Sequence, residues 1–162
     1  MTQLAVILLG SNLDNRQLLL SEARKNLATR GEIAQASAIY ETAAWGKMDQ
    51  PAFLNQVITL ETKEEPEELI TFFLQLENKL GRKRSEPWAA RTIDIDLLFL
   101  GNTIFQSEKV TIPHPRITDR RFTLVPLCEV LPYFQHPVLH KTMKELLMDC
   151  TDPLPVKKTK LR

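Results

Sequence analysis

The hydrophobic and polar positions at the start of the chain predict a strand followed by a helix. Residues 4–9 form a continuous apolar run closed by Gly10, which is typical of a strand buried on both faces. Asn12, Asp14 or Asn15 can then cap a helix. The apolar residues of this helix recur at helical spacing and are Leu19, Leu20, Ala23 and Leu27.

The next pattern predicts two strands joined by a long loop. Residues 33–40 and 53–62 have the composition of strands. The connection at 42–52 is rich in turn formers and is long for a hairpin loop. Loops of this length are more often functional or mobile than idle, so we expect a lid here.

A second helix and a fourth strand complete the main pattern. Pro66 suits the first turn of the helix, and Gly81 ends it. Its apolar stripe is Leu69, Phe73, Leu76 and Leu80. A basic loop then leads into RTIDIDLLFLG, residues 91–101, which has the pattern of a strand. The order βαββαβ predicts an α+β ferredoxin-like sandwich, with helices packed on an antiparallel sheet.

The C-terminal third is interrupted by prolines, which predict short pieces. We expect helices at 118–130 and 143–148, forming a short Pro-rich helical extension. No repeat or second domain is evident. The sequence therefore predicts one domain over 1–162, with a core at about 4–147 and a flexible tail at 150–162.

Composition narrows the class of protein. The chain has 162 residues, 43% hydrophobic and 25% charged, which is typical of a compact globular domain. A net charge of +1 gives no whole-chain sign of a nucleic-acid or membrane partner. Cys128 and Cys150 lack metal-ligand spacing and suit reduced thiols. No run approaches the ~20 apolar residues of a membrane span, so we expect a soluble cytoplasmic protein.

The strand at 91–101 carries an unusual pair of carboxylates. Side chains alternate along a strand, so Asp94 and Asp96 share one face, with Cα atoms about 6–7 Å apart. The other face, which we expect to be the core, has Ile93, Ile95 and Leu97. Such a pair can converge on magnesium, which prefers oxygen ligands. Taken alone, such a pair is more often part of an ordinary strand with one solvated face.

Basic residues on both sides of the pair favour phosphate binding. Arg82, Lys83, Arg84 and Arg91 precede it in a loop that also contains Trp88. Arginine forks match phosphate oxygens, although the loop could also be a solvated surface run and Trp88 a core residue. After the pair come Lys109, His114, Arg116, Arg120, Arg121 and Phe122. Phe53 and Phe122 could stack on a flat heterocycle whose edge Asn55 reads, although each aromatic alone is more often core.

Four blocks together resemble the 6-hydroxymethyl-7,8-dihydropterin pyrophosphokinase family. They are GSNLDNR, YETAAWGKMDQPAFLNQV, LGRKRSEPWAARTIDIDLLF and IPHPRITDRRFTLVPL, in the family's order and spacing. The resemblance implies a ferredoxin-like fold and transfer of pyrophosphate from ATP to the hydroxymethyl oxygen of a dihydropterin, giving AMP and the pterin diphosphate of folate synthesis. It implies two Mg²⁺ ions, ATP and the pterin as small-molecule partners, and a monomer.

The resemblance also assigns roles to individual residues. The catalytic residues are Arg82, Arg91, Asp94 and Asp96, of which Asp94 and Asp96 hold the metal. ATP binding falls to Arg84, Trp88, Arg91, Lys109, Thr111, His114 and Arg120. Pterin binding falls to Thr42, Ala44, Trp45, Phe53, Asn55, Asp94 and Phe122. Glu77 is a supporting acid near the metal and the arginines, and Trp88 belongs to a loop that closes over the site.

The chain departs from the family pattern in two loops. Ala43 and Ala44 follow Thr42 where many members have prolines, and Trp45 replaces a smaller aliphatic residue. The loop at 84–91 is a residue shorter than in some members, with Pro87 in place of arginine and AAR in place of GPR. Leu74 replaces a glutamine that touches the nucleotide in some members. These changes affect secondary ATP contacts and loop kinetics and leave the metal pair intact.

Two other functions compete with this interpretation. An RNA-binding module can use the same architecture but needs aromatic residues on its central strands, and residues 4–9 have none. A metal-dependent phosphohydrolase would use the aspartates and arginines with water as the nucleophile. It leaves Phe53, Asn55 and Phe122 without a role.

Overall fold

The computed structural model describes residues 1–12, 15–43, 52–81 and 93–162. At the centre of the sheet lies β1 (Gln3–Ser11), as its apolar run predicts. It pairs antiparallel with β4 (Phe53–Thr62) on one side and β5 (Asp94–Leu100) on the other. The bounds of β4 match the predicted 53–62. The fold combines helices with an antiparallel sheet, as the sequence predicts.

The outer edge of β4 carries β2 (Glu32–Ala36) and β3 (Tyr40–Thr42), both antiparallel to it. The sequence predicted one strand over 33–40, and this was wrong. Ser37 keeps one backbone bond to β4, since its N–H donates to the Val57 carbonyl at 2.8 Å, but the Val57 N–H donates to Ser37 Oγ, at 3.0 Å, in place of a carbonyl. The next N–H, that of Ala38, donates to the Glu129 carboxylate, at 3.0 Å to Oε2. At Ser37 and Ala38, side-chain acceptors thus interrupt the regular strand pairing.

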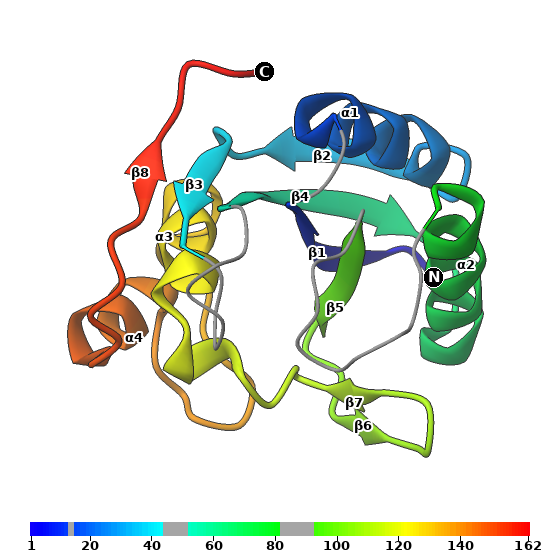
Figure 1. The fold of residues 1–162 in the computed structure, drawn as a ribbon. Coiled ribbons are helices and arrows are strands. Elements are labelled where there is room, and N and C mark those ends of the chain that lie inside the picture. Colours follow the sequence, from blue (N-terminus) through cyan, green and yellow to red (C-terminus); the bar gives the residue numbers. More distant parts are fainter. Residues whose placement is uncertain (13–14, 44–51, 82–92) are drawn as a thin grey trace.

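Two helices cover one face of the sheet (Figure 1). The first, α1 (Arg16–Leu27), is capped by Asn15, whose side chain accepts from the Leu18 N–H at 3.0 Å. The second, α2 (Pro66–Lys79), begins with a proline in its first turn and is followed by Gly81 at φ +96°. The core between these helices and the sheet includes Ile7, Leu9, Leu27, Ile58, Phe73 and Leu97.

The other face of the sheet carries two further helices. There lie α3 (Arg121–Val130), after a 3-10 turn at Ile117–Asp119, and α4 (Met143–Asp149). The predicted helix at 118–130 is thus a turn followed by a helix. A second apolar core forms beneath α3 and α4, with Val6, Leu8, Val57, Phe99, Leu124, Leu127 and Met143. The described part of the chain therefore has α-helices on both faces of the sheet (Figure 1).

A small hairpin and the C-terminus complete the chain. The hairpin of β6 (Phe105–Gln106) and β7 (Thr111–Ile112) continues into His114, whose N–H donates to the Leu98 carbonyl of β5 at 3.0 Å. At the other edge of the sheet, β8 (Lys157–Lys158) pairs with β3. The tail at 150–162, expected to be flexible, instead has a paired strand and a buried carboxylate, Asp152. No helix in the described ranges has the length and apolar character needed to cross a membrane.

Candidate active site

A row of three residues crosses the face of the sheet that also carries α3 and α4. Asp94 on β5 pairs with Gly10 on β1, and Gly10 pairs with Asn55 on β4. Paired residues of antiparallel strands face the same way, and adjacent strands lie about 4.8 Å apart, so Asp94 and Asn55 stand about 10 Å apart on one face. A Cβ at Gly10 would lie 3.0 Å from Asn55 Oδ1. The Asp94–Gly10–Asn55 row is thus a shallow floor with a polar group at each end.

The Asn55 end of the row brings together three of the predicted pterin residues. Asn55, 3% exposed, donates from Nδ2 to Thr42 Oγ1 at 3.1 Å. Phe53 pairs with Thr42 across β4 and β3. It lies two residues before Asn55 on β4, and therefore faces the same side. Phe53 Cδ1 lies 3.8 Å from the position of a Cβ at Gly10. An aromatic ring and buried polar groups therefore border this end of the floor.

At the other end, β5 presents its two carboxylates. Asp94 and Asp96 are partly exposed, whereas Ile93, Ile95 and Leu97 are at most 5% exposed and lie in the core beneath α1 and α2. The alternation that the sequence predicts is confirmed. The strand thus presents apolar side chains on one face and carboxylates on the other.

Behind this strand, Glu77 of α2 reaches the backbone between the two aspartates. Its Oε2 accepts from the Ile95 N–H at 2.8 Å, and the residue is 2% exposed. A carboxylate at this depth normally needs strong partners, and a backbone donor supplies one. Glu77 thereby anchors the β5 backbone at Ile95, between Asp94 and Asp96.

Arg120 and Phe122 lie on either side of Arg121, the first residue of α3. The guanidinium carbon of Arg120 lies 5.6 Å from the centre of the Phe122 ring, within cation–π range. Burial lowers the pKa of Arg120 below its ordinary value, while nearby Asp96 and Asp94 act in the opposite direction. Arginine remains charged despite such a shift. Among the described residues, its buried Nε has no hydrogen-bond partner.

His114 is held in one orientation by the main chain. Its Nδ1 accepts from the Arg116 N–H at 3.1 Å, so in the neutral ring the proton sits on Nε2. Burial lowers the pKa of His114 to about 4, with Arg120 acting in the same direction and Asp94 against it. At neutral pH the side chain is therefore an uncharged donor through Nε2.

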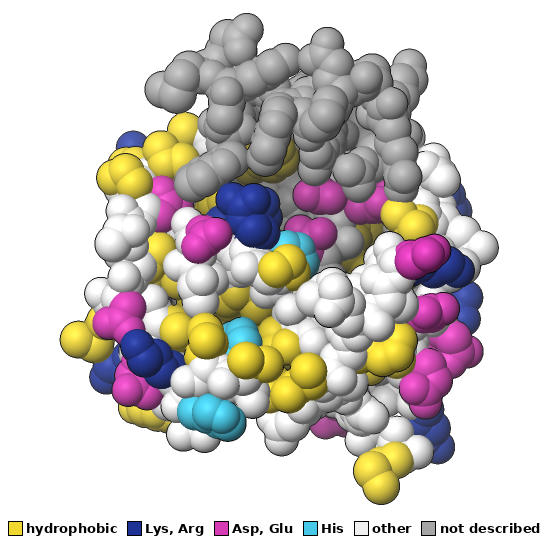
Figure 2. Space-filling model, turned by 90° about the horizontal axis from the view of Figure 1, so that it is seen from below, with side chains coloured by type: hydrophobic (Ala, Val, Ile, Leu, Met, Phe, Trp, Pro, Cys, Tyr) yellow, Lys and Arg dark blue, Asp and Glu magenta, His cyan; other side chains and the backbone are white. Residues whose placement is uncertain are grey.

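A cavity of about 290 Å³ lies beside Asp96 and joins several predicted nucleotide residues. Lys109, Thr111 and His114 line it together with Asp96. Its remaining described lining residues are Ile70, Ile95, Leu97, Ser107, Glu108, Val110 and Pro115. The cavity thus combines apolar walls with a lysine and a histidine next to a carboxylate, which suits a flat base bearing phosphates. Figure 2 shows acidic, basic and histidine side chains gathered on one part of this face.

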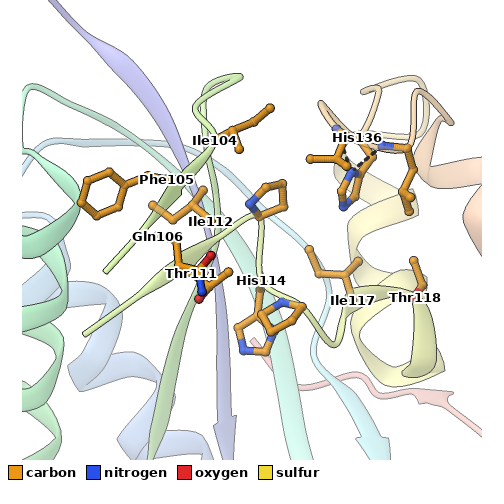
Figure 3. A pocket seen from close by; sticks show the side chains of 13 residues that line it. Ile104, Phe105, Gln106, Thr111, Ile112, His114, Ile117, Thr118 and His136 are labelled. Carbon is orange, nitrogen blue, oxygen red and sulfur yellow. Dashed lines mark hydrogen bonds between the residues drawn. The ribbon is translucent and has the colours of Figure 1, made fainter. Parts of the chain in front are cut away.

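A second cavity, of about 420 Å³, lies on the other side of the segment that carries His114 (Figure 3). Its described lining includes Phe105, Ile112, Ile117 and His136 and contains no Lys, Arg, Asp or Glu. His136 is held by the Val138 and Leu139 N–H groups, both of which donate to its Nδ1, at 3.2 and 3.1 Å. This apolar cavity does not suit a triphosphate.

The carboxylate pair fits magnesium on chemical grounds. Within the described ranges no group of three or more His, Cys, Asp or Glu side chains could enclose a metal ion. Magnesium usually takes only one or two protein carboxylates and completes its shell with water and substrate phosphates. Asp94 and Asp96 supply two such carboxylates, and Asp96 lines the cavity that also holds Lys109.

Several predicted site residues lie outside the described residues. They are Ala44, Trp45, Arg82, Arg84, Trp88 and Arg91, and most of the expected lid at 42–52 falls there too. Conversely, the sequence did not single out Gly10 as part of the site. Its signals in the sequence were its place at the end of the first apolar run and at the start of the block GSNLDNR, but the register that sets it between Asn55 and Asp94 comes from strand pairing.

Comparison with known proteins points to one family. A family model for 7,8-dihydro-6-hydroxymethylpterin-pyrophosphokinase (HPPK) matches residues 6–132. The 2-amino-4-hydroxy-6-hydroxymethyldihydropteridine pyrophosphokinase of Synechocystis sp. is 39% identical over 158 residues, which cover 94% of this chain and 80% of that protein. The protein of the same name from Bacillus subtilis is 38% identical over 132 residues, covering 80% and 79%.

Solved structures agree on the fold. The Plasmodium falciparum HPPK-DHPS structure with pteroate superposes with a TM-score of 0.73 and 19% identity, covering 92% of this chain. This chain spans only 42% of the Plasmodium chain. At this identity the likeness concerns the fold alone.

Proposed function

The chain belongs to the 7,8-dihydro-6-hydroxymethylpterin-pyrophosphokinase family, and we propose that the two ends of its site hold that family's two substrates. The reaction transfers pyrophosphate from ATP to 6-hydroxymethyl-7,8-dihydropterin in folate biosynthesis. The observation that carries the proposal is the Asp94–Gly10–Asn55 row, which separates a ring-binding end from a metal-binding end by about 10 Å.

The pterin ring would lie over Gly10. A side chain at Gly10 would crowd Asn55 Oδ1, which lies 3.0 Å from the position of a Cβ there, so the glycine allows the Asn55 amide to sit at this end of the floor beside Phe53. Phe53 and Phe122 would stack on the ring, with Asn55 and Thr42 hydrogen-bonding its edge. Ala44 and Trp45, from the loop after Thr42, would complete the pocket. In this pose the hydroxymethyl group would point along the row toward Asp94.

ATP would occupy the cavity beside Asp96. Support comes from Lys109, Thr111 and His114, which share that cavity, and from the charge of Arg120 near both aspartates. His114 would donate from Nε2 without adding a further positive charge to those of Lys109 and Arg120. Arg84, Trp88 and Arg91 would add further contacts, and Arg82 and Arg91 would stabilise the charge on the transferred group.

Asp94 and Asp96 would hold two magnesium ions between the substrates. When bound, magnesium neutralises phosphate charge and aligns the reacting oxygens. The pterin hydroxymethyl oxygen forms a bond to the β-phosphorus of ATP as the bond from that phosphorus to the AMP oxygen breaks. The hydroxyl proton is released, and AMP and the pterin diphosphate result. Glu77 would support this geometry by holding β5.

Predictions about the fold layout, the assembly state and the location accompany this function. The sheet order β5-β1-β4, with β2 and β3 beyond β4, supports the ferredoxin-like layout, and α3 and α4 would be its helical extension. The monomeric state and the cytoplasmic location stay predictions from the sequence.

The direct test follows the nucleotide product. Purified protein with Mg²⁺, ATP and 6-hydroxymethyl-7,8-dihydropterin should form AMP and pterin diphosphate in equal amounts. Omitting the pterin should stop AMP formation. Production of ADP, or ATP breakdown that is indifferent to pterin, would count against the proposal and in favour of a phosphohydrolase.

A further inference from the structure

The segment after α4 makes unusual contacts with the beginning of α3. The carboxylate of Asp152, 6% exposed, accepts from the Arg121 N–H through Oδ2 and from the Leu154 N–H through Oδ1, both at 3.0 Å. In return, the Arg121 guanidinium donates from Nε to the Asp152 carbonyl at 2.9 Å and from Nη2 to the Cys150 carbonyl at 3.2 Å. Main chain and side chain are thus both linked at this point.

Asp152 caps the N-terminus of α3 although it is distant from that helix in sequence. Helices need acceptors for their first N–H groups, and α3 receives none from the side chain of its own N-cap residue, Arg120. The Asp152 carboxylate, 31 residues away in sequence from Arg121, fills that role and places a negative charge at the positive end of the helix. Arg121 stands between Arg120 and Phe122, so this cap holds the backbone that presents both side chains.

Further along, the same segment is attached to β3. Lys157 and Lys158 pair with Glu41 and Tyr40. Thr159 donates to the Ile39 carbonyl twice, from N–H at 2.9 Å and from Oγ1 at 2.8 Å. The short strand β3 ends at Thr42, whose Oγ1 accepts from Asn55. Figure 1 shows β8 beside β3, with the chain leading to it from α4.

We propose that residues 150–159 form a C-terminal strap that positions the substrate-binding groups of α3 and β3. Asp152 is a positioning residue for Arg120 and Phe122, and therefore acts on both ATP and the pterin. The β8 attachment acts on Thr42, and therefore on the pterin alone. The Tyr40 hydroxyl donates to Glu129 Oε1 at 2.5 Å and already joins β3 to the C-terminal end of α3. The strap adds a second connection, at the N-terminal end of α3, which is nearer the site. The inference rests on the proposed function.

The first experiment compares two acidic residues of the same region. Asp152→Ala should weaken equilibrium binding of ATP and of the pterin by about tenfold each, since it removes charged hydrogen bonds at the cap. Asp152→Asn, which keeps one acceptor oxygen, should recover part of the loss. Asp149→Ala is the matched control, because Asp149 is exposed and pairs with Lys141 at 2.9 Å. It should bind both substrates as the unmodified chain does.

The second experiment separates the two attachments. Thr159→Pro removes both donors to Ile39 and should weaken pterin binding by about fivefold with unchanged ATP binding. Thr159→Ser keeps both donors and should behave as the unmodified chain. Binding is measured by calorimetry on each full-length variant, with circular dichroism as the check of folding.

The outcomes separate the strap from the function. Unchanged binding constants in folded Asp152→Ala, or equal losses in Asp152→Ala and Asp149→Ala, would overturn the strap. If Asp152→Ala does not fold, unchanged binding constants in Asp152→Asn and Thr159→Pro would overturn the strap. An unmodified chain that forms no AMP contradicts the proposed function instead, whereas an active chain that is indifferent to these substitutions contradicts only the strap.

Discussion

The two faces of the sheet use the same strands for different purposes. Toward α1 and α2, the strands present a continuous apolar surface that includes Ile7, Leu9, Ile58 and Leu97. Toward α3 and α4, the apolar surface is confined to residues such as Val6, Leu8 and Val57. Beyond it on that face lie Asp94 and Asn55, on either side of Gly10. The second face therefore carries polar residues beside its apolar core, whereas the first face is apolar along these strands.

This difference predicts that neighbouring residues fail in different ways. Side chains alternate across a strand, so a substitution on the polar part of one face removes chemistry without opening the core. A substitution one residue away removes packing. Activity and stability can therefore be separated by comparing the two faces.

The largest expected effect is that of Asp96→Ala on turnover. We expect a loss of about a thousandfold or more, since one of two carboxylates at the proposed metal site is removed. The residue is partly exposed, so the folded state should persist. AMP formation and circular dichroism measure the two properties. An unfolded variant would show that Asp96 is a structural residue.

Leu9→Ala tests the opposite face. Leu9 is fully buried, packs in the core beneath α1 and α2, and directly precedes Gly10. We expect a loss of about 2–5 kcal/mol in the free energy of unfolding, from lost transfer energy and the cavity left behind. Urea denaturation measures the change. Turnover per folded molecule should stay near that of the unmodified chain, and a thousandfold loss would erase the distinction between the faces.

Asn55→Ala tests the ring-binding end of the row. Removal of a buried amide that bonds Thr42 should raise the KM for the pterin by about ten- to a hundredfold, at little cost to the KM for ATP. Steady-state kinetics with each substrate varied in turn measures both. Equal increases in the two values would contradict the division of the row into two ends.

The smallest expected effect is the pH dependence of stability at His114. Its pKa falls from the ordinary 6.5 to about 4 on folding. Between these values the unfolded chain binds more protons than the folded chain, so stability is lost as pH falls from about 6.5 toward 4, by at most about 1.4 kcal/mol per pH unit for one proton. His136, whose pKa burial also lowers, contributes in the same direction.

His114→Gln should reduce this slope without abolishing it. Urea denaturation at pH 7, 6 and 5 measures the effect, and between pH 7 and 8 the difference between the two proteins should stay constant. Identical slopes in the acidic range would show that His114 titrates alike in the folded and unfolded chains.

Local patterns predicted the regular elements well. The strand at 53–62, the proline at the start of α2 and the alternation between Asp94, Ile95 and Asp96 follow from short-range preferences, and the structure bears them out. The single strand expected at 33–40 failed because side-chain acceptors interrupt the strand pairing at Ser37 and Ala38. No local pattern near Ser37 predicts that the N–H of the next residue, Ala38, donates to Glu129.

By itself, the sequence determined the family, the apolar runs that make the strands and the residue types needed for a metal and a flat ring. These properties depend on residues that are close together along the chain or on recognisable blocks of them. Only the tertiary structure decided that Gly10 lies between Asn55 and Asp94, that Glu77 holds the edge of β5, and that Asp152 caps α3. Each of these depends on strand register or on a hydrogen bond between distant segments, and the chain acquires both only when its cores pack.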